Sequence, residues 1–584
     1  MKKLFAIALI TVLLSNQVVF AQTAYSRELS EKIESFIEEH EANMAAMSVA
    51  VFTNQDILFE NAYGYINLEE NTANTLDNSV FEWASVTKLL VSVSVLQLYE
   101  RGYLNLDIDI RAYLHDGFLT GLRYDDPITI LHLLNHSAGF QESTLELAVR
   151  SGNQIRDLSD SLYLLQPPQL HQPGAVTSYS NFGIALAGYI VELITGMPFY
   201  EYVHQNIFSP LGMTGTGLRP DLQDNPWVSQ QIYNINSYNS NLQRLDVAYW
   251  NIQWYPAGSA TGTISDFRKF GQALLADENG KSPLFENAET LRRMYTPTSY
   301  FPDGVTGRLY HAFIGEPFFG GHVIGHGGNT NMTAGLFIDI ENGIGAVIMT
   351  NQSQETIFNR QMPRLIFGVS DFAQINQQRE STISGLFNDV ATFQRGMFRA
   401  TRIFMIQPFG EILLPSQVEG AYIFDQLSFV FFASEENLSN VIIDFAPVSL
   451  STLIFDALSH ALILIGGLYG LISLIFLILS SRKKKEKILP WPRGFIYVAF
   501  ILAGTSWLSF AFNQINVSFT YGLAIAHGIV FALAALVIII SLVLTIVKMR
   551  AFKLNIKSKL QFTITFIMGL LVVSSILYFQ LWML

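Results

Sequence analysis

Four long stretches without a charged residue dominate the last part of the chain. They cover residues 461–481, 494–512, 517–547 and 560–584. The hydrocarbon core of a bilayer is about 30 Å thick, and roughly 20 apolar residues in a helix cross it. We therefore expect four transmembrane helices and a lipid bilayer as a partner. These stretches also explain why only 14% of the 584 residues are charged, where soluble proteins carry about 25%.

Positive charges mark one side of these helices. Eleven Lys and Arg follow Leu450, and all of them lie in the loops 482–493 and 548–559. The short connection 513–516 has none. Because basic loops stay on the cytoplasmic side, we expect this connection, the C-terminus and the chain before residue 451 to lie outside the cytoplasm.

The first 21 residues are predicted to be a secretory signal peptide. Lys2 and Lys3 precede an apolar run over 4–14, and the small residue Ala21 ends the segment. This three-part order is typical of cleavable signals. An uncleaved membrane anchor is the alternative, and under both interpretations the chain from Gln22 onward is exported.

Charge and cysteine content exclude several functions. The net charge of the whole chain is −13. Because the chain after Leu450 carries +9 and the first 21 residues carry +2, residues 22–450 carry a net charge of −24. Phosphate binding depends on clustered Lys and Arg, and we therefore expect no nucleic-acid partner. The absence of cysteine excludes disulfides, thiolate zinc sites and cysteine nucleophiles.

The exported segment has strand patterns at both ends and helical patterns between them. Two pairs of apolar stretches flank short turns, at 46–53 with 57–65 and at 336–339 with 346–350. Apolar residues at three- and four-residue spacing predict helices over 86–101, 128–135 and 181–195. We expect one sheet built from both ends of the segment, with helices inserted between. Two later stretches, 427–432 and 438–445, indicate a small β-module before the membrane.

Ser85 and Lys88 form the first candidate for chemistry. Residues 22–450 contain only four lysines, and Lys88 lies three residues after Ser85 at the start of an apolar run. Residues three apart share a helix face, so the amine can reach the hydroxyl. A desolvated lysine can take a serine proton. A serine in the first helical turn also offers its backbone N–H to an oxyanion.

Two further patterns follow along the chain. Tyr179-Ser180-Asn181 precedes an amphipathic helix, and His326-Gly327-Gly328-Asn329 precedes the strand at 336–339. Each spacing alone is a weak signal, because Ser-x-x-Lys, Tyr-x-Asn and His-x-Gly all recur elsewhere in the chain. The ordered set, with one predicted strand pair before it and one after it, is far more specific.

With this set the chain resembles the serine β-lactamase and penicillin-binding-protein superfamily, in particular the branch of class C β-lactamases and D-aminopeptidases. That family carries Ser-x-x-Lys, Tyr-x-Asn and Lys/His-x-Gly in the order found here at 85, 179 and 326. Residues 133–140 and 256–259 resemble two more of its loops. The resemblance covers about 33–369 and implies an α/β (α+β) β-lactamase-like fold, with an antiparallel sheet, flanking helices and an all-helical insertion.

The resemblance also implies roles for single residues. Ser85 would be the nucleophile, Lys88 its activating partner and Tyr179 the proton shuttle to the leaving group. Which of Lys88 and Tyr179 is the principal base stays open. The substrate-binding and oxyanion residues would be Asn181, His326, Gly328 and Asn329, with the backbone N–H groups of Ser85 and Asn329 holding the oxyanion.

These patterns together predict four parts of the chain. They are a signal peptide (1–21), a β-lactamase-like serine hydrolase domain (22–372), a small β-rich module (373–450) and a membrane domain with four transmembrane helices (451–584). The histidines show no metal-ligand spacing, so we expect no catalytic metal and no cofactor.

Two departures from the family pattern concern the substrate. His326 stands where β-lactamases have a Lys that helps to hold a substrate carboxylate, and a neutral imidazole attracts that carboxylate less. This change disfavours efficient penicillin hydrolysis. Residues 329–333 also lack the Pro-Gly that often follows the motif, so the alignment beyond Asn329 is open.

The function predicted from these observations is that of an exported, membrane-anchored serine hydrolase. It would cleave a small peptide, amide or ester through an acyl-enzyme on Ser85. A prodrug-activating or D-amino-acid-specific peptidase is the alternative substrate class. A penicillin-binding sensor that does not turn over is an alternative from another class, and a hydrolase fused to a transporter or assembled with a partner membrane protein is a third.

Overall fold

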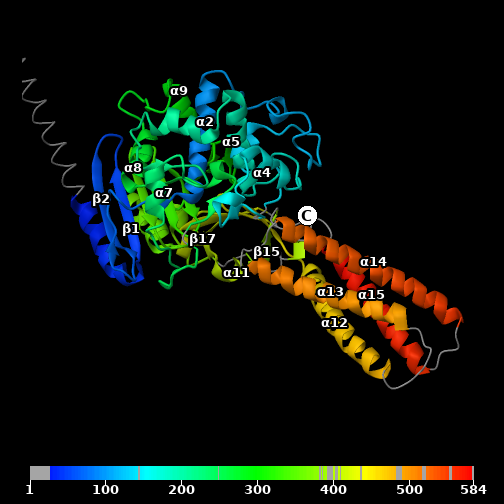
Figure 1. The fold of residues 1–584 in the computed structure, drawn as a ribbon. Coiled ribbons are helices and arrows are strands. Elements are labelled where there is room, and N and C mark those ends of the chain that lie inside the picture. Colours follow the sequence, from blue (N-terminus) through cyan, green and yellow to red (C-terminus); the bar gives the residue numbers. More distant parts are fainter. Residues whose placement is uncertain are drawn as a thin grey trace, which may run out of the picture. The chain divides into compact units, whose positions relative to one another are not determined.

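The computed structural model describes residues 27–581 with short internal gaps (Figure 1). The gaps are 143–144, 248, 380–382, 384–385, 391–398, 401–405, 408, 435–436, 482–489, 516–520 and 552–555. The predicted signal peptide therefore lies outside the described residues. The chain divides into two compact units, which are described separately below. The first comprises Met1–Phe140, Leu147–Ile383 and Gly410–Asp444, and the second comprises Gln141–Glu146, Ser384–Phe409 and Phe445–Leu584.

A nine-stranded antiparallel sheet organises the first unit. Its order is β3-β2-β1-β14-β13-β12-β11-β10-β9. The strands are β1 (Ala46–Phe52), β2 (Ile57–Asn67), β3 (Thr72–Ala73), β9 (Ser299–Tyr300), β10 (Gly307–Tyr310), β11 (Phe313–Gly315), β12 (Val323–Asn329), β13 (Thr333–Asp339) and β14 (Ile344–Thr350). Both predicted hairpins are present, as β1 with β2 and β13 with β14. Strand β1 also pairs with β14, which confirms a sheet built from both ends of the segment.

Helices cover both faces of this sheet. On one face, the helix over residues 27–40 and the turn η7 (Ile357–Gln361) enclose a core with alternate side chains of β1, such as Val49 and Val51. On the other, α8 (Ile264–Ala273) packs against β1 and β14 (Figure 1). Gly271 of α8 allows this approach, because a Cβ there would lie 2.5 Å from the Phe52 ring. All seven residues of β1 are therefore buried.

The segment between the two hairpins is mainly helical and is centred on α2 (Lys88–Glu100). This helix packs against α5 (Asn181–Thr195). Apolar residues continue around it and nearly all of it is buried, which is typical of a helix at the centre of a large domain. Other helices of this segment are α3 (Ile130–Leu134), α4 (Leu158–Leu164), α6 (Phe199–Val203), α7 (Pro226–Ile232) and α9 (Ala288–Met294), whereas α10 (Pro363–Phe367) follows the second hairpin.

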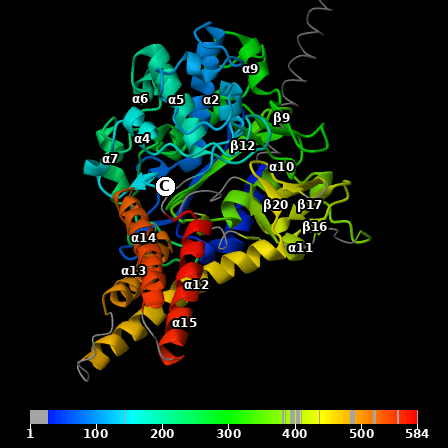
Figure 2. The same ribbon diagram turned by 90° about the vertical axis from the view of Figure 1, so that its right-hand side faces the viewer.

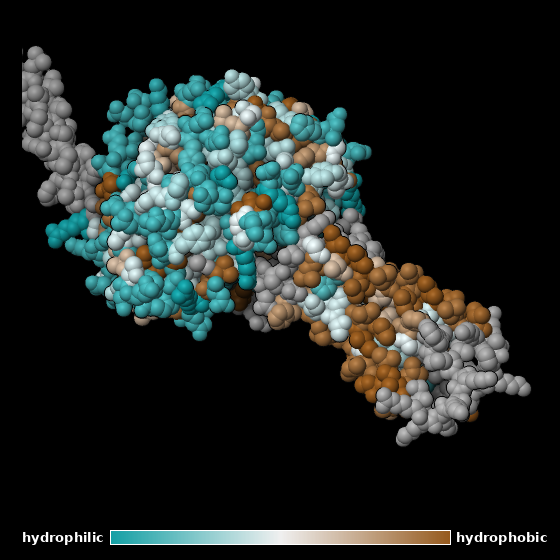
Figure 3. Space-filling view, viewed as in Figure 1, coloured by the Kyte–Doolittle hydropathy of each residue, from teal (hydrophilic) through white to brown (hydrophobic). Residues whose placement is uncertain are grey.

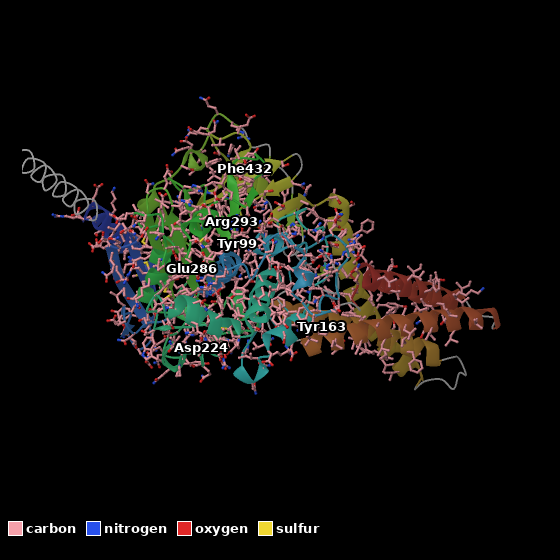
Figure 4. All side chains as sticks on the ribbon, turned by 90° about the horizontal axis from the view of Figure 1, so that it is seen from above. Tyr99, Tyr163, Asp224, Glu286, Arg293 and Phe432 are labelled. Atoms are coloured by element: carbon pink, nitrogen blue, oxygen red, sulfur yellow. The ribbon has the colours of Figure 1, made fainter. Side chains whose placement is uncertain are left out.

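Short strands and surface contacts complete the inserted segment. A small sheet joins β4 (Phe81–Glu82), β8 (Thr261–Gly262) and β6 (Thr216–Gly217), and β5 (Ala148–Val149) pairs with β7 (Asn251–Ile252). Helix α9 is held to the end of α2 by Arg293, whose guanidinium lies 4.8 Å from the centre of the Tyr99 ring (Figure 4). These contacts fix the helices that frame the site.

The stretches predicted to form a β-module are strands. The antiparallel run β16 (Leu414–Pro415), β17 (Ala421–Phe424), β18 (Phe429–Ser434) and β19 (Asn437–Ser439) belongs to the first unit (Figure 2). Its inner residues share one core with the main sheet, and Phe432 stacks on Phe301 at 4.4 Å (Figure 4). The module is therefore packed into the first unit, although it follows the strands of the main sheet in sequence.

The second unit contains four long apolar helices. They are α12 (Leu450–Ser481), α13 (Pro490–Ile515), α14 (Tyr521–Ala551) and α15 (Ile556–Tyr578), and each is long and apolar enough to cross a membrane. Helices α12 and α13 approach closely at Gly467 and Gly504, as small residues allow in membranes. Large apolar side chains cover the outside of the bundle, which appears brown in Figure 3. Strand β20 (Asp444–Pro447), which ends shortly before α12, pairs with β15 (Phe387–Asp389).

Candidate active site

The structure brings all seven predicted site residues together. Five of them line one cavity: Ser85, Tyr179, His326, Gly328 and Asn329. Lys88 contacts Ser85, and Asn181 contacts Lys88. Ser85 lies on the turn η2 (Ala84–Thr87), which leads directly into α2. The preceding Ala84 has a φ of 47°, a left-handed conformation that costs free energy in a residue other than glycine. This strained turn presents the Ser85 hydroxyl to the cavity.

Lys88 is fully buried and makes three hydrogen bonds. Its Nζ atom donates to Ser85 Oγ at 3.0 Å, to Asn181 Oδ1 at 2.8 Å and to the carbonyl oxygen of Ala257 at 2.6 Å. Three acceptors match the three protons of an ammonium group. The predicted contact between Ser85 and Lys88 is therefore present, and α5 and the turn η6 (Tyr255–Ala257) hold the amine in place. Sequence reasoning found the loop that contains Ala257 but not the role of its carbonyl.

Tyr179 lies over the lysine and is positioned by a residue that sequence reasoning missed. The centre of its ring is 4.8 Å from Lys88 Nζ. His136 packs beside this ring at 4.6 Å, and its Nδ1 accepts a hydrogen bond from the backbone N–H of Ser180 at 3.2 Å. Burial lowers the pKa of His136 well below its ordinary value, so the ring remains a neutral acceptor. The only signal in the sequence was the family-like loop at 133–140.

His326 stands on β12 beside Tyr179, with 6.3 Å between the ring centres. The imidazole is 2% exposed, and its Nδ1 lies 2.5 Å from the carbonyl oxygen of Gly327. Burial, aided by the charge of Lys88, lowers the pKa of His326 to about 3. The side chain is therefore neutral near pH 7 and offers no positive charge to a substrate carboxylate.

Gly328 brings β12 into contact with the turn that carries Ser85. A Cβ atom at this position would lie 2.1 Å from the carbonyl oxygen of Trp83 and 2.9 Å from the backbone nitrogen of Ser85. No other amino acid fits without moving one of these backbones. The strand then ends at Asn329, whose side-chain oxygen accepts hydrogen bonds from Thr333 Oγ1 and from the backbone N–H of Gln354. These contacts place the end of β12 next to the Ser85 N–H.

A buried carboxyl group joins the two segments on either side of the oxyanion region. Glu82 Oε2, on β4, accepts a hydrogen bond from the hydroxyl of Thr330 at 2.9 Å. Burial raises the pKa of Glu82 to about 8. The group is therefore largely protonated at neutral pH, and it links the strand before Ser85 to the residue after Asn329.

The β-module contributes to the cavity as well. A cavity of about 270 Å³ is lined by Ser85, Tyr179 and His326 and also by Phe429, Val441 and Ile442 of the module. Asp444 anchors the module here: the Thr177 N–H donates to its Oδ2 at 2.8 Å, and Arg308 Nη2 lies 2.9 Å from its Oδ1. No local pattern in the sequence relates the module residues to Ser85, so sequence reasoning missed them.

Metal ligands are not grouped in the described part of the chain. No set of three or more His, Asp or Glu residues there is arranged to hold a metal ion. The chemistry offered by the described residues is that of a serine hydroxyl, a lysine amine and a tyrosine hydroxyl. A nucleophile in contact with an amine, beside a phenol and two backbone N–H groups, is typical of a serine hydrolase.

Comparison with known proteins identifies the family. The Beta-lactamase family model matches residues 32–370, and the chain belongs to this family. Its members with this fold are serine hydrolases that act through an acyl-enzyme. Penicillin-binding protein 4* of Bacillus subtilis is 26% identical over 43% of this chain and 56% of its own length. A putative D-alanyl-D-alanine carboxypeptidase of Escherichia coli is 27% identical over 41% of this chain and 57% of its own length.

Solved structures share the fold at lower identity. An octameric penicillin-binding protein homologue from Pyrococcus abyssi has a TM-score of 0.50 and 18% identity, covering 71% of this chain and 99% of that one. SurE has a TM-score of 0.51 and 16% identity, covering 73% of this chain and 99% of that one. The chain spans just over half the length of the two curated relatives named above, and the structures show the fold alone.

Proposed function

We propose that this protein is an exported, membrane-anchored serine hydrolase that cleaves a small peptide, amide or ester through an acyl-enzyme on Ser85. The observation that carries the proposal is the 3.0 Å contact between Ser85 Oγ and the buried Lys88 Nζ, with the Tyr179 ring beside it. A lysine amine at this distance can take the serine proton when it is in its neutral form. Serine hydroxyls need such a neighbour to become nucleophilic.

In the proposed reaction, the Ser85 hydroxyl loses its proton to Lys88 or to ionised Tyr179, and Oγ attacks the acyl carbon. The backbone N–H groups of Ser85 and Asn329 stabilise the negative oxygen. Tyr179 passes the proton to the leaving nitrogen or oxygen as its bond to the acyl carbon breaks. Water then attacks the acyl carbon and gives a proton to the same base. As the bond between the acyl carbon and Oγ breaks and the acid leaves, the base returns this proton to Ser85 Oγ. Asn181 orients Lys88 and the substrate.

The proposed substrates are amides and esters without a free carboxylate near the scissile bond. The support is His326, which is buried and neutral, so it supplies no cation where a penicillin carboxylate would lie. Because the curated relatives include a penicillin-binding protein and a putative D-alanyl-D-alanine carboxypeptidase, amides of D-amino acids are the first peptide substrates to test.

The exported location rests on charge and on the four helices. After Leu450, all Lys and Arg residues lie in the loops 482–493 and 548–559, and four helices of sufficient length alternate with the connections between them. Because the chain has no cysteine, a maleimide can label only a cysteine that has been introduced. A cysteine in place of Asp303, which is exposed, should react with an impermeant maleimide in intact cells, and one in place of Lys485 should react only after lysis. The reverse pattern contradicts the proposed topology.

The central test uses a fluorescent fluorophosphonate on the full-length protein in detergent. Wild type should be labelled, and Ser85→Ala should not. Ser137→Ala is the matched control, because Ser137 is also partly buried in a loop near the site but lies outside the proposed machinery. Equal labelling of all three proteins contradicts the proposal. Hydrolysis of D-alanine amide over L-alanine amide supports the peptide class, whereas acylation without product release favours a sensor.

A further inference from the structure

The cavity beside Ser85 extends over the other face of β12, because two glycines face each other there. Gly327 on β12 pairs with Gly335 on β13. Side chains alternate along a strand, so Gly327 faces away from Trp83 and Ser85, which its neighbour Gly328 approaches. A Cβ on Gly327 would meet no atom within 4 Å. Gly327 therefore leaves a hollow in the sheet, whereas the Phe337 ring covers Gly335, where a Cβ would lie 2.8 Å from it. Both glycines line the cavity.

The walls of this hollow are mainly apolar. Phe337 of β13 and the module residues Phe429, Val441 and Ile442 line it. The volume of about 270 Å³ lies just below the roughly 300–1,000 Å³ typical of sites for whole drug-sized ligands. This size suits one substituent of a substrate whose scissile bond lies at Ser85.

The charged groups of the cavity already have partners. Arg360 Nη1 and Nη2 donate to the two oxygens of Glu316 at 3.0 and 2.9 Å. Glu355 accepts hydrogen bonds from the backbone N–H groups of Phe358 and Asn359 and from Asn359 Nδ2. A charged substituent would therefore find no unmatched charge here, and its burial would be costly.

Among the described residues that line the cavity, His326 Nε2 and Asn359 Oδ1 are buried without a hydrogen-bond partner, and Asn359 lies against Gly335. Asn359 is 2% exposed, and its Oδ1 makes no hydrogen bond. Its Nδ2 donates to Glu355 at 2.8 Å, which fixes the amide orientation because the amide oxygen cannot donate to the carboxylate. Oδ1 then lies 3.4 Å from the position that a Cβ atom would occupy if Gly335 had one, at the wall of the hollow. A buried acceptor of this kind lowers its free energy when a ligand supplies a donor.

We propose that this hollow is a specificity subsite for an aromatic substituent of the substrate that carries a neutral hydrogen-bond donor at its end, such as a phenol. The ring would lie over Gly327, beside the Phe337 ring and the β-module, and its O–H would donate to Asn359 Oδ1. This inference rests on the proposed hydrolase function. The substituent could belong to the acyl group or to the leaving group, and the chemistry of recognition is the same for both.

The test compares ester hydrolysis by the full-length protein in detergent. One series varies the acyl group of a nitrophenyl ester: acetyl, phenylpropanoyl and para-hydroxyphenylpropanoyl. The other varies the alcohol of an acetate: ethyl, phenylethyl and para-hydroxyphenylethyl. In one series the ring should raise kcat/KM roughly 10- to 100-fold over the small group, as burial of an aromatic ring allows. The hydroxyl should add roughly 3- to 10-fold.

Two variants locate the effect. Gly327→Leu projects a side chain into the hollow and should remove the preference for the ring in that series. Asn359→Leu keeps the shape but lacks the acceptor, so only the added effect of the hydroxyl should disappear. Fluorophosphonate labelling of Ser85 verifies that each variant is folded, and Val441→Phe fills the hollow from the module if Gly327→Leu does not fold.

The outcomes separate the inference from the proposed function. If wild type hydrolyses the small and aromatic esters with equal kcat/KM in both series, the subsite is absent, although the proposed hydrolase function is unaffected. If the ring is preferred but filling the hollow leaves that preference unchanged, the ring binds elsewhere and the inference is overturned. If Ser85→Ala hydrolyses the esters as fast as wild type, the proposed function itself fails.

Discussion

Gly328→Ala tests how closely β12 must approach the turn that carries Ser85. An added Cβ would lie 2.1 Å from the Trp83 carbonyl oxygen, a distance well under the 3.0 Å below which such contacts essentially never occur. The strand or the turn must therefore move by about 1 Å. A displacement of this size between aligned reacting groups lowers the rate by roughly 100-fold. We expect that loss in the rate constant of acylation.

The assay is the initial rate of acylation of the full-length protein by a small acetyl ester, with the thermal unfolding midpoint measured in parallel. Gly327→Ala is the matched control, since it adds the same atom to the next residue on the opposite face, where nothing lies within 4 Å. It should lose far less activity than Gly328→Ala. If Gly328→Ala stays within about threefold of wild type, or if both variants lose activity equally, close packing of β12 is not what the site requires.

Three further changes test the electrostatics of the same unit. The pKa of Glu82 rises from 4.5 to about 8 on folding, so the folded state binds this proton more tightly and stability should fall by up to about 5 kcal/mol as pH rises through that window. Over the same rise in pH, the thermal unfolding midpoint of Glu82→Gln should fall less than that of wild type. Equal falls in the two proteins would contradict the raised pKa of Glu82. Since the pKa of His326 is about 3, His326→Gln should keep the shape of the pH–acylation profile between about pH 5 and 7; loss of an acid limb there would show that His326 titrates. Arg360→Met leaves Glu316 buried without its partner and should lower the free energy of unfolding by roughly 3–5 kcal/mol, while adding Glu316→Leu should restore most of it. Urea unfolding measures the free energy of unfolding of the single and the double variant. Equal destabilisation of the two would contradict the expected cost of a buried, unpaired Glu316.

Much of the fold could be predicted because its signals are local. The hairpins at β1–β2 and β13–β14 were predicted from stretches rich in aliphatic and aromatic residues with a turn between them, and the four apolar helices from length and composition. The contact between Ser85 and Lys88 followed from one turn of helix. The predicted roles of the site residues and the predicted domain limits stay predictions, although the structure places those residues around one cavity.

Other features could not be predicted because they depend on residues that are far apart in sequence. The carbonyl of Ala257 reaches Lys88 across 169 residues, and His136 supports the backbone at Ser180 across 44. Phe429 and Val441 line the cavity with Ser85, although β18 and the connection between β19 and β20, where they lie, have no sequence feature of an active site. Such contacts leave no periodic pattern, since each is created only when separate elements pack together.

The sequence by itself determined which kinds of element this protein has, because hydrophobic period and charge act over a few neighbouring residues. It also predicted Ser85, Lys88 and Tyr179 as catalytic residues. The folded structure added that β14 is the strand with which β1 pairs, that His326 is buried, and that the β-module closes one wall of the cavity. Burial and long-range packing set those properties, and both belong to the assembled core rather than to any segment of the chain.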